Sequence, residues 1–353
     1  MRVLVLGAGG PAGSNFCKSL RISNNQYYIV GTDCNPYHVH FMEQFVDKGF
    51  LIHKATQDMY YNDIRSIVED EEIDVIYAQS DTEVKYLSLI VKRLAQETGV
   101  KYCLPSAKTI MKCQNKQTSG KIWEQNPPYL FSDPVKINEV KKSFDLIESD
   151  QIWIRASHGA GGKASFCAKD IESAYHWIRF WQVSHPNVSM IAQRYIKGKN
   201  IAWQSVWYNG ELITSQARER LEYIYPHLNP SGITGTPVVA KTIHDPEVNI
   251  ACVEAVKKIS PRPHGVFCVD LIKDKKNKCY ITEINCGRFF TTSYFFAYAG
   301  MKHNVVYANM PDLLMQLAKY DFLHYIEKYN FKELRGIKQI NILPYYQPQN
   351  YLP

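Results

Sequence analysis

The chain has 353 residues, of which 45% are hydrophobic, and a formal net charge of +7. This length and composition allow two or three globular domains with their own cores, and they exclude a low-complexity or fibrous protein. The positive charge is modest and spread along the chain, which argues against a nucleic-acid-binding surface. It fits a mixed surface or a pocket that attracts phosphate and carboxylate groups.

None of the nine cysteines forms a CxxC pair, and several lie in apolar runs, such as Cys268 in GVFCVDLI. We interpret them as reduced, mostly buried thiols of a cytoplasmic protein. The first strand pattern begins at Arg2, so we expect no signal peptide. No apolar run reaches the ~18 residues of a membrane-spanning helix. We therefore expect a cytoplasmic protein without membrane or nucleic-acid partners.

The first hundred residues alternate strand and helix patterns. Helical spacing of apolar residues occurs at 11–21, 61–72 and 83–99, and short apolar runs that predict strands occur at 2–7, 27–33, 50–55, 73–79 and 101–105. Repeated β-α-β units of this length predict an α/β fold with a parallel, doubly wound sheet.

The pattern changes after residue 105. Residues 106–126 form a polar helical stretch. From about residue 150, strand and turn patterns dominate, and two strands flank a charged turn within 265–285. Residues 310–329 predict a helix with an apolar stripe. Strands and turns, with a helix near the end, are therefore expected to dominate the chain after about residue 150.

The segment GAGGPAG, residues 7–13, follows the first strand pattern and opens the first helix pattern. Its glycines permit a tight turn and a close approach of the backbone to a ligand, and Asp33 ends the second strand. One interpretation is an NAD(P) site with Asp33 on the ribose. The other is a Rossmann-like domain whose glycines only pack the helix against the strand. These residues alone leave both open.

A second glycine-rich segment, IRASHGAGGKAS, includes Arg155 at the end of a strand pattern. The backbone N–H groups of Gly159, Gly161 and Gly162 can turn inward onto an anion that Arg155 could also reach. The spacing is not that of a P-loop, because GxxxxGK[ST] is absent. A phosphate-binding loop and a plain hairpin turn both remain open.

The segment CVDLIKDKKNKCYITEINCGR, residues 268–288, carries acids on two strands joined by a polar turn. Side chains alternate along a strand, so Glu283 and Asn285 share a face, and Asp270 can lie across from them in a hairpin. Three oxygen ligands of this kind suit Mg²⁺ together with phosphate oxygens. Arg288 follows closely and could neutralise a transferring phosphoryl group. The alternative is a set of solvated polar positions on a half-exposed sheet.

Over roughly residues 1–300, these motifs resemble the ATP-grasp superfamily, and within it the carbamoyl-phosphate-synthetase-like group of carboxylate–amine ligases. The resemblance rests on LGAGGPAGSNFCKSLR (6–21), QSDTEVKYLSLI (79–90), PSAKTIMKCQNKQTS (105–119), IWIRASHGAGGKAS (152–165), IAQRYIKGKNIAWQ (191–204) and VDLI…YITEINCGR. It implies a Rossmann-like pre-ATP-grasp domain over 1–105 and a two-lobed α+β module. The small lobe with the glycine-rich loop would span 106–197, and the large lobe with the Mg²⁺ site and C-terminal helices 198–353.

The resemblance also implies roles for individual residues. It assigns nucleotide binding to Lys116, Arg155, Gly161, Gly162, Lys163, Gln193, Tyr195, Ile196 and Asn200, and metal binding to Asp270, Glu283 and Asn285. Arg288 would steady the phosphoryl group in transfer, and Arg218 or Arg220 would pair with the reacting carboxylate. The chain departs from the family at Gln193 and Asn200, which stand where the family usually has acids. Cys286 stands where a proline often follows the Asn of the metal motif.

The implied reaction uses ATP with Mg²⁺, for which Mn²⁺ could substitute. ATP phosphorylates a small-molecule carboxylate, and an amine displaces phosphate from the acyl phosphate. In this family the Rossmann-like domain usually binds no NAD and helps to form the substrate side. Two alternatives stay open: an NAD(P) oxidoreductase, motivated by residues 7–13 and Asp33, and a non-catalytic nucleotide-binding module, motivated by Gln193 and Asn200. A homodimer is also left open.

Overall fold

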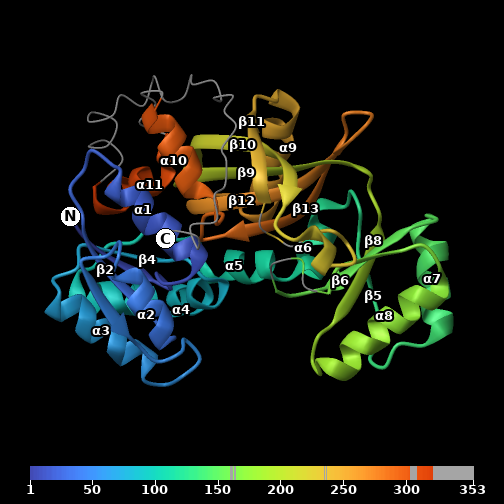
Figure 1. Ribbon diagram of the computed structural model, residues 1–353, viewed down its shortest axis with the longest axis horizontal. Coiled ribbons are helices and arrows are strands. Elements are labelled where there is room, and N and C mark those ends of the chain that lie inside the picture. The colour runs from blue at the N-terminus through green and yellow to red at the C-terminus, as the bar shows by residue number, and fades with distance from the viewer. Residues whose placement is uncertain (160–161, 163, 234, 236, 303–307, 321–353) are drawn as a thin grey trace.

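The computed structural model describes residues 1–159, 162, 164–233, 235, 237–302 and 308–320. Three sheets organise these residues: a four-stranded parallel sheet, a second four-stranded sheet, and a five-stranded antiparallel sheet. In Figure 1 the parallel sheet lies at the lower left, the second sheet at the right, and the five-stranded sheet above them. Helices α5 (Ala107–Gln114) and α6 (Lys116–Trp123) run between the lower left and the right of this view.

The parallel sheet predicted for the first hundred residues is confirmed, with strand order β3-β2-β1-β4. Its elements are β1 (Arg2–Leu6), α1 (Pro11–Arg21), β2 (Tyr28–Asp33), α2 (Pro36–Met42), β3 (Lys48–Leu51), α3 (Tyr60–Asp70), β4 (Val75–Ala78) and α4 (Asp81–Thr98). Val3 and Val5 of β1 belong to a core with α1 and α2, whereas Leu4 and Leu6 belong to a core with α3 and α4. Both faces are therefore covered, as is usual for parallel sheets.

Details of this region differ from the sequence-based expectation. The third strand covers 48–51 rather than 50–55, and the last predicted strand contributes only a bridge from Lys101 to Val75. The sequence pattern does not predict helix α2, because Met42 is its only buried residue and so short a helix carries little periodic signal.

The helical stretch predicted over 106–126 forms two helices, α5 and α6. Asn115 separates them, because its side chain accepts a hydrogen bond from the backbone N–H of Thr118 and caps α6. Helix α6 begins at Lys116, whose backbone N–H donates to the carbonyl of Ser157 beyond β6. The cap thus fixes the position at which the Lys116 side chain leaves the helix.

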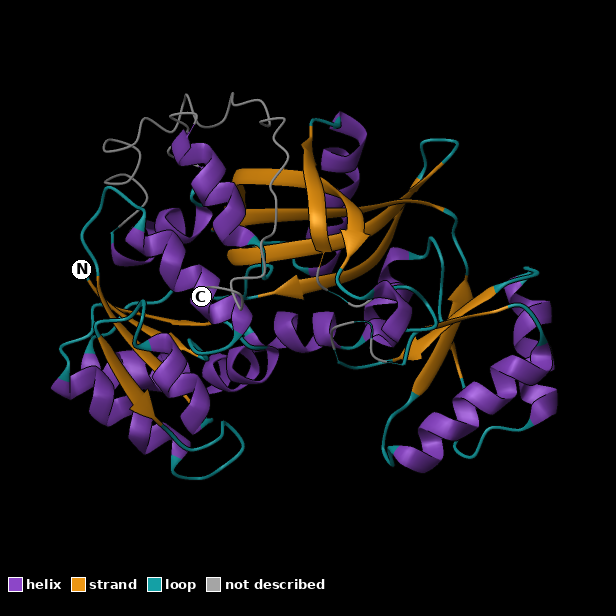
Figure 2. Ribbon diagram, in the orientation of Figure 1, coloured by secondary structure: helices purple, strands orange, loops and turns teal. Residues whose placement is uncertain are grey.

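The second sheet has the order β5-β8-β6-β7 and antiparallel pairing. Its elements are β5 (Tyr129–Leu130), α7 (Ile137–Ile147), β6 (Ile152–Ala156), β7 (Phe166–Ala168), α8 (Ile171–Ser184) and β8 (Met190–Arg194). Ile152 and Ile154 of β6 pack in one core with Ile178 of α8. Figure 2 shows both helices on the outer side of this sheet. Arg155 alternates with these isoleucines and lies on the opposite, inner face.

The five-stranded sheet has the order β11-β10-β9-β12-β13. The elements of this region are β9 (Gly198–Tyr208), β10 (Glu211–Tyr223), a 3₁₀ turn (Pro226–Leu228), β11 (Pro237–Ile243), α9 (Pro246–Ile259), β12 (Gly265–Asp274), β13 (Cys279–Cys286), α10 (Ser293–Lys302) and α11 (Met310–Lys319). Trp203 and Leu271 pack with Val256 of α9, while Ala202 and Cys268 belong to the core on the other face. The helix predicted over 310–329 is confirmed over Met310–Lys319 and ends there, because Tyr320 is extended; residues 321–329 lie outside the described residues.

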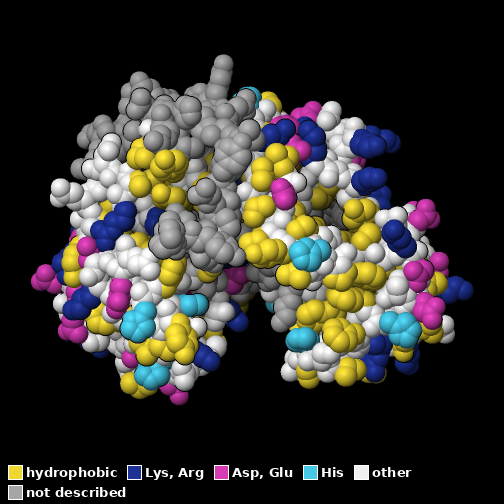
Figure 3. Space-filling view, in the orientation of Figure 1, with side chains coloured by type: hydrophobic (Ala, Val, Ile, Leu, Met, Phe, Trp, Pro, Cys, Tyr) yellow, Lys and Arg dark blue, Asp and Glu magenta, His cyan; other side chains and the backbone are white. Residues whose placement is uncertain are grey.

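The space-filling view in Figure 3 shows a wedge-shaped hollow between the lower left and lower right parts of the molecule. Seven of the nine cysteines are buried, while Cys34 is exposed and Cys167 is half-buried. Within the described ranges, no helix is both long enough and apolar enough to span a membrane.

Candidate functional site

A cavity of about 390 Å³ lies between the five-stranded sheet and the second sheet. It is lined by every predicted site residue that the structure describes: Lys116, Arg155, Gly162, Gln193, Tyr195, Ile196, Asn200, Arg218, Arg220, Asp270, Glu283, Asn285 and Arg288. Gly161 and Lys163 lie outside the described residues. The fold therefore gathers residues from all parts of the predicted motifs in one pocket of the size that small molecules occupy.

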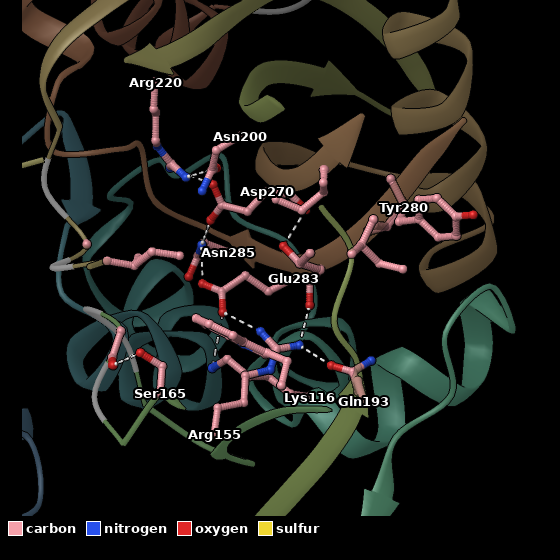
Figure 4. A pocket seen from close by; sticks show the side chains of 18 of the residues that line it. Lys116, Arg155, Ser165, Gln193, Asn200, Arg220, Asp270, Tyr280, Glu283 and Asn285 are labelled. Atoms are coloured by element: carbon pink, nitrogen blue, oxygen red, sulfur yellow. Dashed lines mark hydrogen bonds and ion pairs between the residues drawn. The ribbon is translucent and has the colours of Figure 1, made fainter. Parts of the chain in front are cut away.

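One row across the five-stranded sheet carries the central side chains. Arg218 of β10 pairs with Ala202 of β9, Ala202 pairs with Asp270 of β12, and Asp270 pairs with Glu283 of β13. Directly opposed residues share a face of the sheet, so all four side chains are on the cavity side. The pairing confirms the predicted hairpin. Asn285 lies beside both acids and donates to Asp270 at 3.3 Å and to Glu283 at 3.1 Å (Figure 4).

Cationic side chains flank the two carboxylates. Arg220 lies 2.5 Å from Asp270 on one side, and Lys116 and Arg155 lie 3.3 and 3.7 Å from Glu283 on the other (Figure 4). Burial raises the pKa of Asp270, although the Arg220 charge opposes this. Burial also acts to raise the pKa of Glu283, but the charges of Lys116 and Arg155 overcome it and lower that pKa to about 2. Glu283 is therefore ionised at neutral pH.

The donor set fits a divalent cation that is held jointly with phosphate. Asp270 and Glu283 face each other, and the Asn285 amide contacts both. No group of three or more His, Cys, Asp or Glu side chains able to hold a metal occurs in the described part of the chain. The Asn285 NH2 faces the acids and its oxygen accepts from Arg288, so this oxygen would join the two carboxylates once the amide turns over. Two carboxylates and an amide oxygen suit Mg²⁺, which usually takes one or two protein carboxylates and completes its shell with phosphate and water oxygens.

The two hinge residues that depart from the family pattern hold arginines in place. Arg155 donates to the Gln193 side-chain oxygen at 2.7 Å, and Gln193 donates to the carbonyl of Asn126. Arg220 donates to the Asn200 side-chain oxygen at 3.2 Å. Both amides thus have protein partners that orient cations toward the acids, and their contacts to a nucleotide remain predictions.

The glycine-rich loop contacts the segment that follows β10. Asn229 donates to the carbonyl oxygens of Gly162 at 3.1 Å and Ile233 at 2.7 Å. The hydroxyl oxygens of Ser165 and Ser231 lie 2.8 Å apart. These contacts, which we call the loop clasp, join the second sheet to the opposite wall of the cavity. The sequence shows only a flexible glycine-containing stretch here and gives no sign of the clasp.

Arg288 is held by the parallel-sheet region. It donates to both carboxylate oxygens of Asp81, the first residue of α4, at 2.5 and 2.9 Å, and to Asn285 at 2.9 Å. The sequence does not reveal this pair, because Ser80 and Glu83 give the local signal of a helix start and Ser80 does cap α4. Asp81 is therefore a site residue that sequence reasoning misses.

Arg218 has a different environment. The residue is 2% exposed, and its Nε and Nη1 atoms have no hydrogen-bond partner among the described residues. Its guanidinium carbon lies 4.8 Å from the ring centre of Phe290 and 5.1 Å from that of Phe296. Burial, and then the neighbouring Arg220, lower the pKa of Arg218 to about 9. The structure thus holds a buried guanidinium with unused donors at the cavity wall.

The other end of the cavity is less polar. Tyr195 and Ile196 follow β8 and line this end with Trp153 and Ile272. The rings of Trp153 and Tyr195 have centres 6.2 Å apart. Flat aromatic and aliphatic surfaces of this kind suit the faces of a planar ring such as a nucleotide base.

The protein itself fills the space around the first glycine motif. A Cβ atom on Gly9 would lie 2.4 Å from the Cβ of His38, and one on Gly13 would lie 2.0 Å from the carbonyl oxygen of Gly7. The Asp33 carboxylate lies 3.2 Å from Nδ1 of His38. These glycines therefore permit the close packing of α1 and α2 around the end of β1, which supports the packing interpretation over an NAD(P) site.

No protein-family model and no curated protein matches the chain. Among solved structures, biotin carboxylase from Campylobacter jejuni in complex with β-γ-ATP is 13% identical with a TM-score of 0.62, covering 90% of this chain and 70% of its own. The biotin carboxylase domain of 2-oxoglutarate carboxylase from Hydrogenobacter thermophilus is 17% identical with a TM-score of 0.59, covering 82% of this chain. The L-amino acid ligase from Bacillus licheniformis is 12% identical with a TM-score of 0.58, covering 90% of this chain and 74% of its own.

The chain spans 64% of the length of the Hydrogenobacter thermophilus chain. At 12–17% identity, these similarities concern the fold. All three structures have the ATP-grasp fold, and the likeness covers 82–90% of this chain. The protein therefore has the ATP-grasp fold.

Proposed function

We propose that this protein is an ATP- and Mg²⁺-dependent ligase that activates a small-molecule carboxylate as an acyl phosphate for attack by an amine. The observation that carries the proposal is the facing pair Asp270 and Glu283, set among cations in the cavity beside the glycine-rich loop. In this structure Arg220 pairs with Asp270, and Lys116 and Arg155 pair with Glu283. A metal bound with a polyphosphate would replace these pairs by contacts of the carboxylates with the metal and of the cations with phosphate oxygens.

The nucleotide would lie with its base at the apolar end, near Tyr195 and Ile196, and its phosphates toward Lys116, Arg155 and Gly162. Two of the similar structures support nucleotide binding, because their names state that they hold MgADP and β-γ-ATP respectively. Gln193 and Asn200 would act by fixing the arginines beside the phosphates.

Asp270, Glu283 and Asn285 would hold Mg²⁺, and Mn²⁺ suits the same oxygen donors. When bound, such a metal neutralises charge on the transferring phosphoryl group and on the departing diphosphate. Lys116 and Arg155 now pair with Glu283. They lie where they could bind phosphate oxygens once a metal takes the carboxylate.

In the first step, a carboxylate oxygen attacks the γ-phosphorus of ATP. An oxygen–phosphorus bond forms, the bond from the γ-phosphorus to the bridging oxygen breaks, and its electron pair leaves with ADP. Arg288, fixed by Asp81, would stabilise the charge on the phosphoryl oxygens during transfer. Arg218 and Arg220 are the proposed residues on the substrate side.

In the second step, the amine nitrogen attacks the acyl carbon. A carbon–nitrogen bond forms, the carbon–oxygen bond to phosphate breaks with its electron pair, and the ammonium proton passes to the released phosphate or to water. Most of the rate enhancement would come from positioning and electrostatics, as in other phosphoryl transfers.

The test replaces Glu283 with Gln, which keeps the shape but removes the charge. ADP release in the presence of a carboxylate and an amine should fall by roughly 10²-fold or more, because metal-assisted charge stabilisation is worth several kcal/mol. Glu254→Gln, an exposed position on α9 behind the sheet, serves as the control and should keep full activity. Undiminished turnover of Glu283→Gln would contradict the proposal.

The alternative function is that of a non-catalytic nucleotide-binding module. It would show thermal stabilisation of the wild-type protein by ATP and Mg²⁺, while no acid in a broad panel elicits ADP.

A further inference from the structure

The cationic side chains around the cavity differ in whether they already have an anionic or acceptor partner. Arg220 pairs with Asp270, and Arg288 pairs with Asp81. Lys116 and Arg155 both lie within 4 Å of Glu283. Arg155 also donates to Gln193 and to a backbone carbonyl. These four cations are therefore compensated within the protein.

Of the two remaining cations, Arg194 is partly exposed and lies over the ring of Tyr280, whereas Arg218 is buried. Its Nε and Nη1 have no partner in the described ranges, although the residue is 98% buried. A buried guanidinium without an ion-pair partner is costly. Nε and Nη1 lie on different edges of the guanidinium, so each has an N–H free to donate a charge-assisted hydrogen bond to a carboxylate oxygen. The rings of Phe290 and Phe296 hold the guanidinium from the sides and limit its movement.

The position of Arg218 is beside the proposed metal pair. Arg218, Ala202 and Asp270 are consecutive members of one row across the sheet, so the backbones of Arg218 and Asp270 are two strand spacings, about 10 Å, apart. Arg218 and Asp270 both line the cavity, whereas Ala202 between them is buried in the core. A carboxylate bound by Arg218 would therefore lie next to the phosphates that Asp270 and Glu283 organise.

The walls at this end of the cavity carry little negative charge. Phe290, Thr292 and Pro237 line it near Arg218. Of the described residues that line the whole cavity, only Asp270 and Glu283 are acidic, against six lysine and arginine side chains. An α-ammonium group next to the bound carboxylate would have no acid free to pair with it.

We propose that Arg218 is the receptor for the reacting carboxylate, and that the substrate class is monocarboxylic acids with an uncharged, partly apolar body and no α-ammonium group. This inference rests on the proposed function. Of the two arginines proposed for the substrate side, it assigns the carboxylate to Arg218, because Arg220 is already paired with Asp270.

The first test compares matched acids that differ only by an α-ammonium group: propanoate with L-alanine, and 3-phenylpropanoate with L-phenylalanine. Hydroxylamine serves as a general nucleophile, and the hydroxamate formed with ATP and Mg²⁺ is measured. The acid without the ammonium group should have the higher kcat/KM in each pair, by at least about tenfold. Hydroxamate from the amino acids alone, or equally from both members, would overturn the substrate class while leaving the proposed function intact.

The second test uses Arg218→Lys and Arg218→Met. Removing a charged hydrogen bond should raise KM for the acid by about tenfold to hundredfold. KM for ATP should stay within about twofold, and thermal stabilisation by MgADP should persist, which also shows that the variants fold. Arg262→Lys, at an exposed position, is the matched control. An unchanged KM for the acid in both Arg218 variants would overturn the assignment. If the wild-type protein forms no hydroxamate from any acid, the proposed function itself fails, and the inference with it.

Discussion

At the scale of single residues, the site depends on which charges find partners within the protein. Asp81 takes both donors of Arg288, and Asp270 takes Arg220, so these arginines are fixed before any ligand arrives. Preorganised charges of this kind cost no reorganisation during reaction. Arg218 keeps its donors free. The three arginines therefore differ in their expected roles because their neighbours differ: two are already paired with acids, and one has free donors.

Asp81 should be a positioning residue that acts through Arg288. Asp81→Asn should lower kcat by about tenfold to hundredfold, as losses of orienting partners do elsewhere, and change KM for ATP little. Asp81→Glu should restore part of kcat. Asp63→Asn is the matched control, because Asp63 also lies in the first turn of a helix and loses the same interaction with the helix dipole. Equal kinetics of Asp81→Asn and the wild-type protein would contradict this role.

At the scale of elements, Gly162 and the loop clasp join the second sheet to the opposite wall of the cavity. Gly162 has a φ of +68°, and a Cβ atom there would lie 2.5 Å from the carbonyl oxygen of Ile233. Gly99, which follows α4, has a φ of +79°, and a Cβ atom there would have no other atom within 4 Å. Both positions have a left-handed backbone conformation that favours glycine, but only at Gly162 would a side chain also collide with the clasp.

We expect Gly162→Ala to raise KM for ATP by about tenfold, because the added methyl pushes the loop away from the clasp. Gly99→Ala should lower the free energy of unfolding by roughly 1–2 kcal/mol, the cost of a left-handed backbone for a residue with a Cβ atom. It should leave KM for ATP unchanged. Steady-state kinetics and urea unfolding of both variants measure the two effects. Identical KM values would show that the clasp has no part in nucleotide binding.

The sequence predicts those elements that are specified by residues close together in the chain. The parallel sheet follows from repeated β-α-β patterns, and the β12–β13 hairpin follows from the alternation around Glu283 and Asn285. The clasp and the Asp81–Arg288 pair are not predictable in this way, because their partners are 67 and 207 residues apart. Likewise, the sequence shows that Arg218 and Arg220 share a strand face, but only the pairing with Asp270 shows which of them is left free.

At the scale of the whole molecule, a buried acid in the parallel-sheet region couples stability to pH. Burial first, and then the Asp33 charge, raise the pKa of Glu83 from 4.5 to about 8, while Tyr60 opposes the shift. The folded chain therefore binds one more proton than the unfolded chain between these pH values. This contribution to stability is fully present below about pH 4.5 and is lost as the pH rises through about 8.

Glu83→Gln should remove this dependence. The variant should match the wild-type free energy of unfolding near pH 5 and exceed it near pH 8.5 by an amount on the order of 2–4 kcal/mol. Urea unfolding at the two pH values measures the difference, and Glu172→Gln, at an exposed position on α8, is the control. A difference that stays constant with pH would show that Glu83 does not titrate in this range.

The proposed function requires that a carboxylate attacks the γ-phosphorus of ATP in the cavity between the sheets. The most direct measurement uses an acid labelled with ¹⁸O in its carboxylate, together with ATP, Mg²⁺ and an amine acceptor or hydroxylamine. An acyl phosphate intermediate transfers one labelled oxygen to the inorganic phosphate, which mass spectrometry detects. We predict ¹⁸O in the phosphate in step with ADP release. Phosphate that carries no label while product forms would contradict the proposed function.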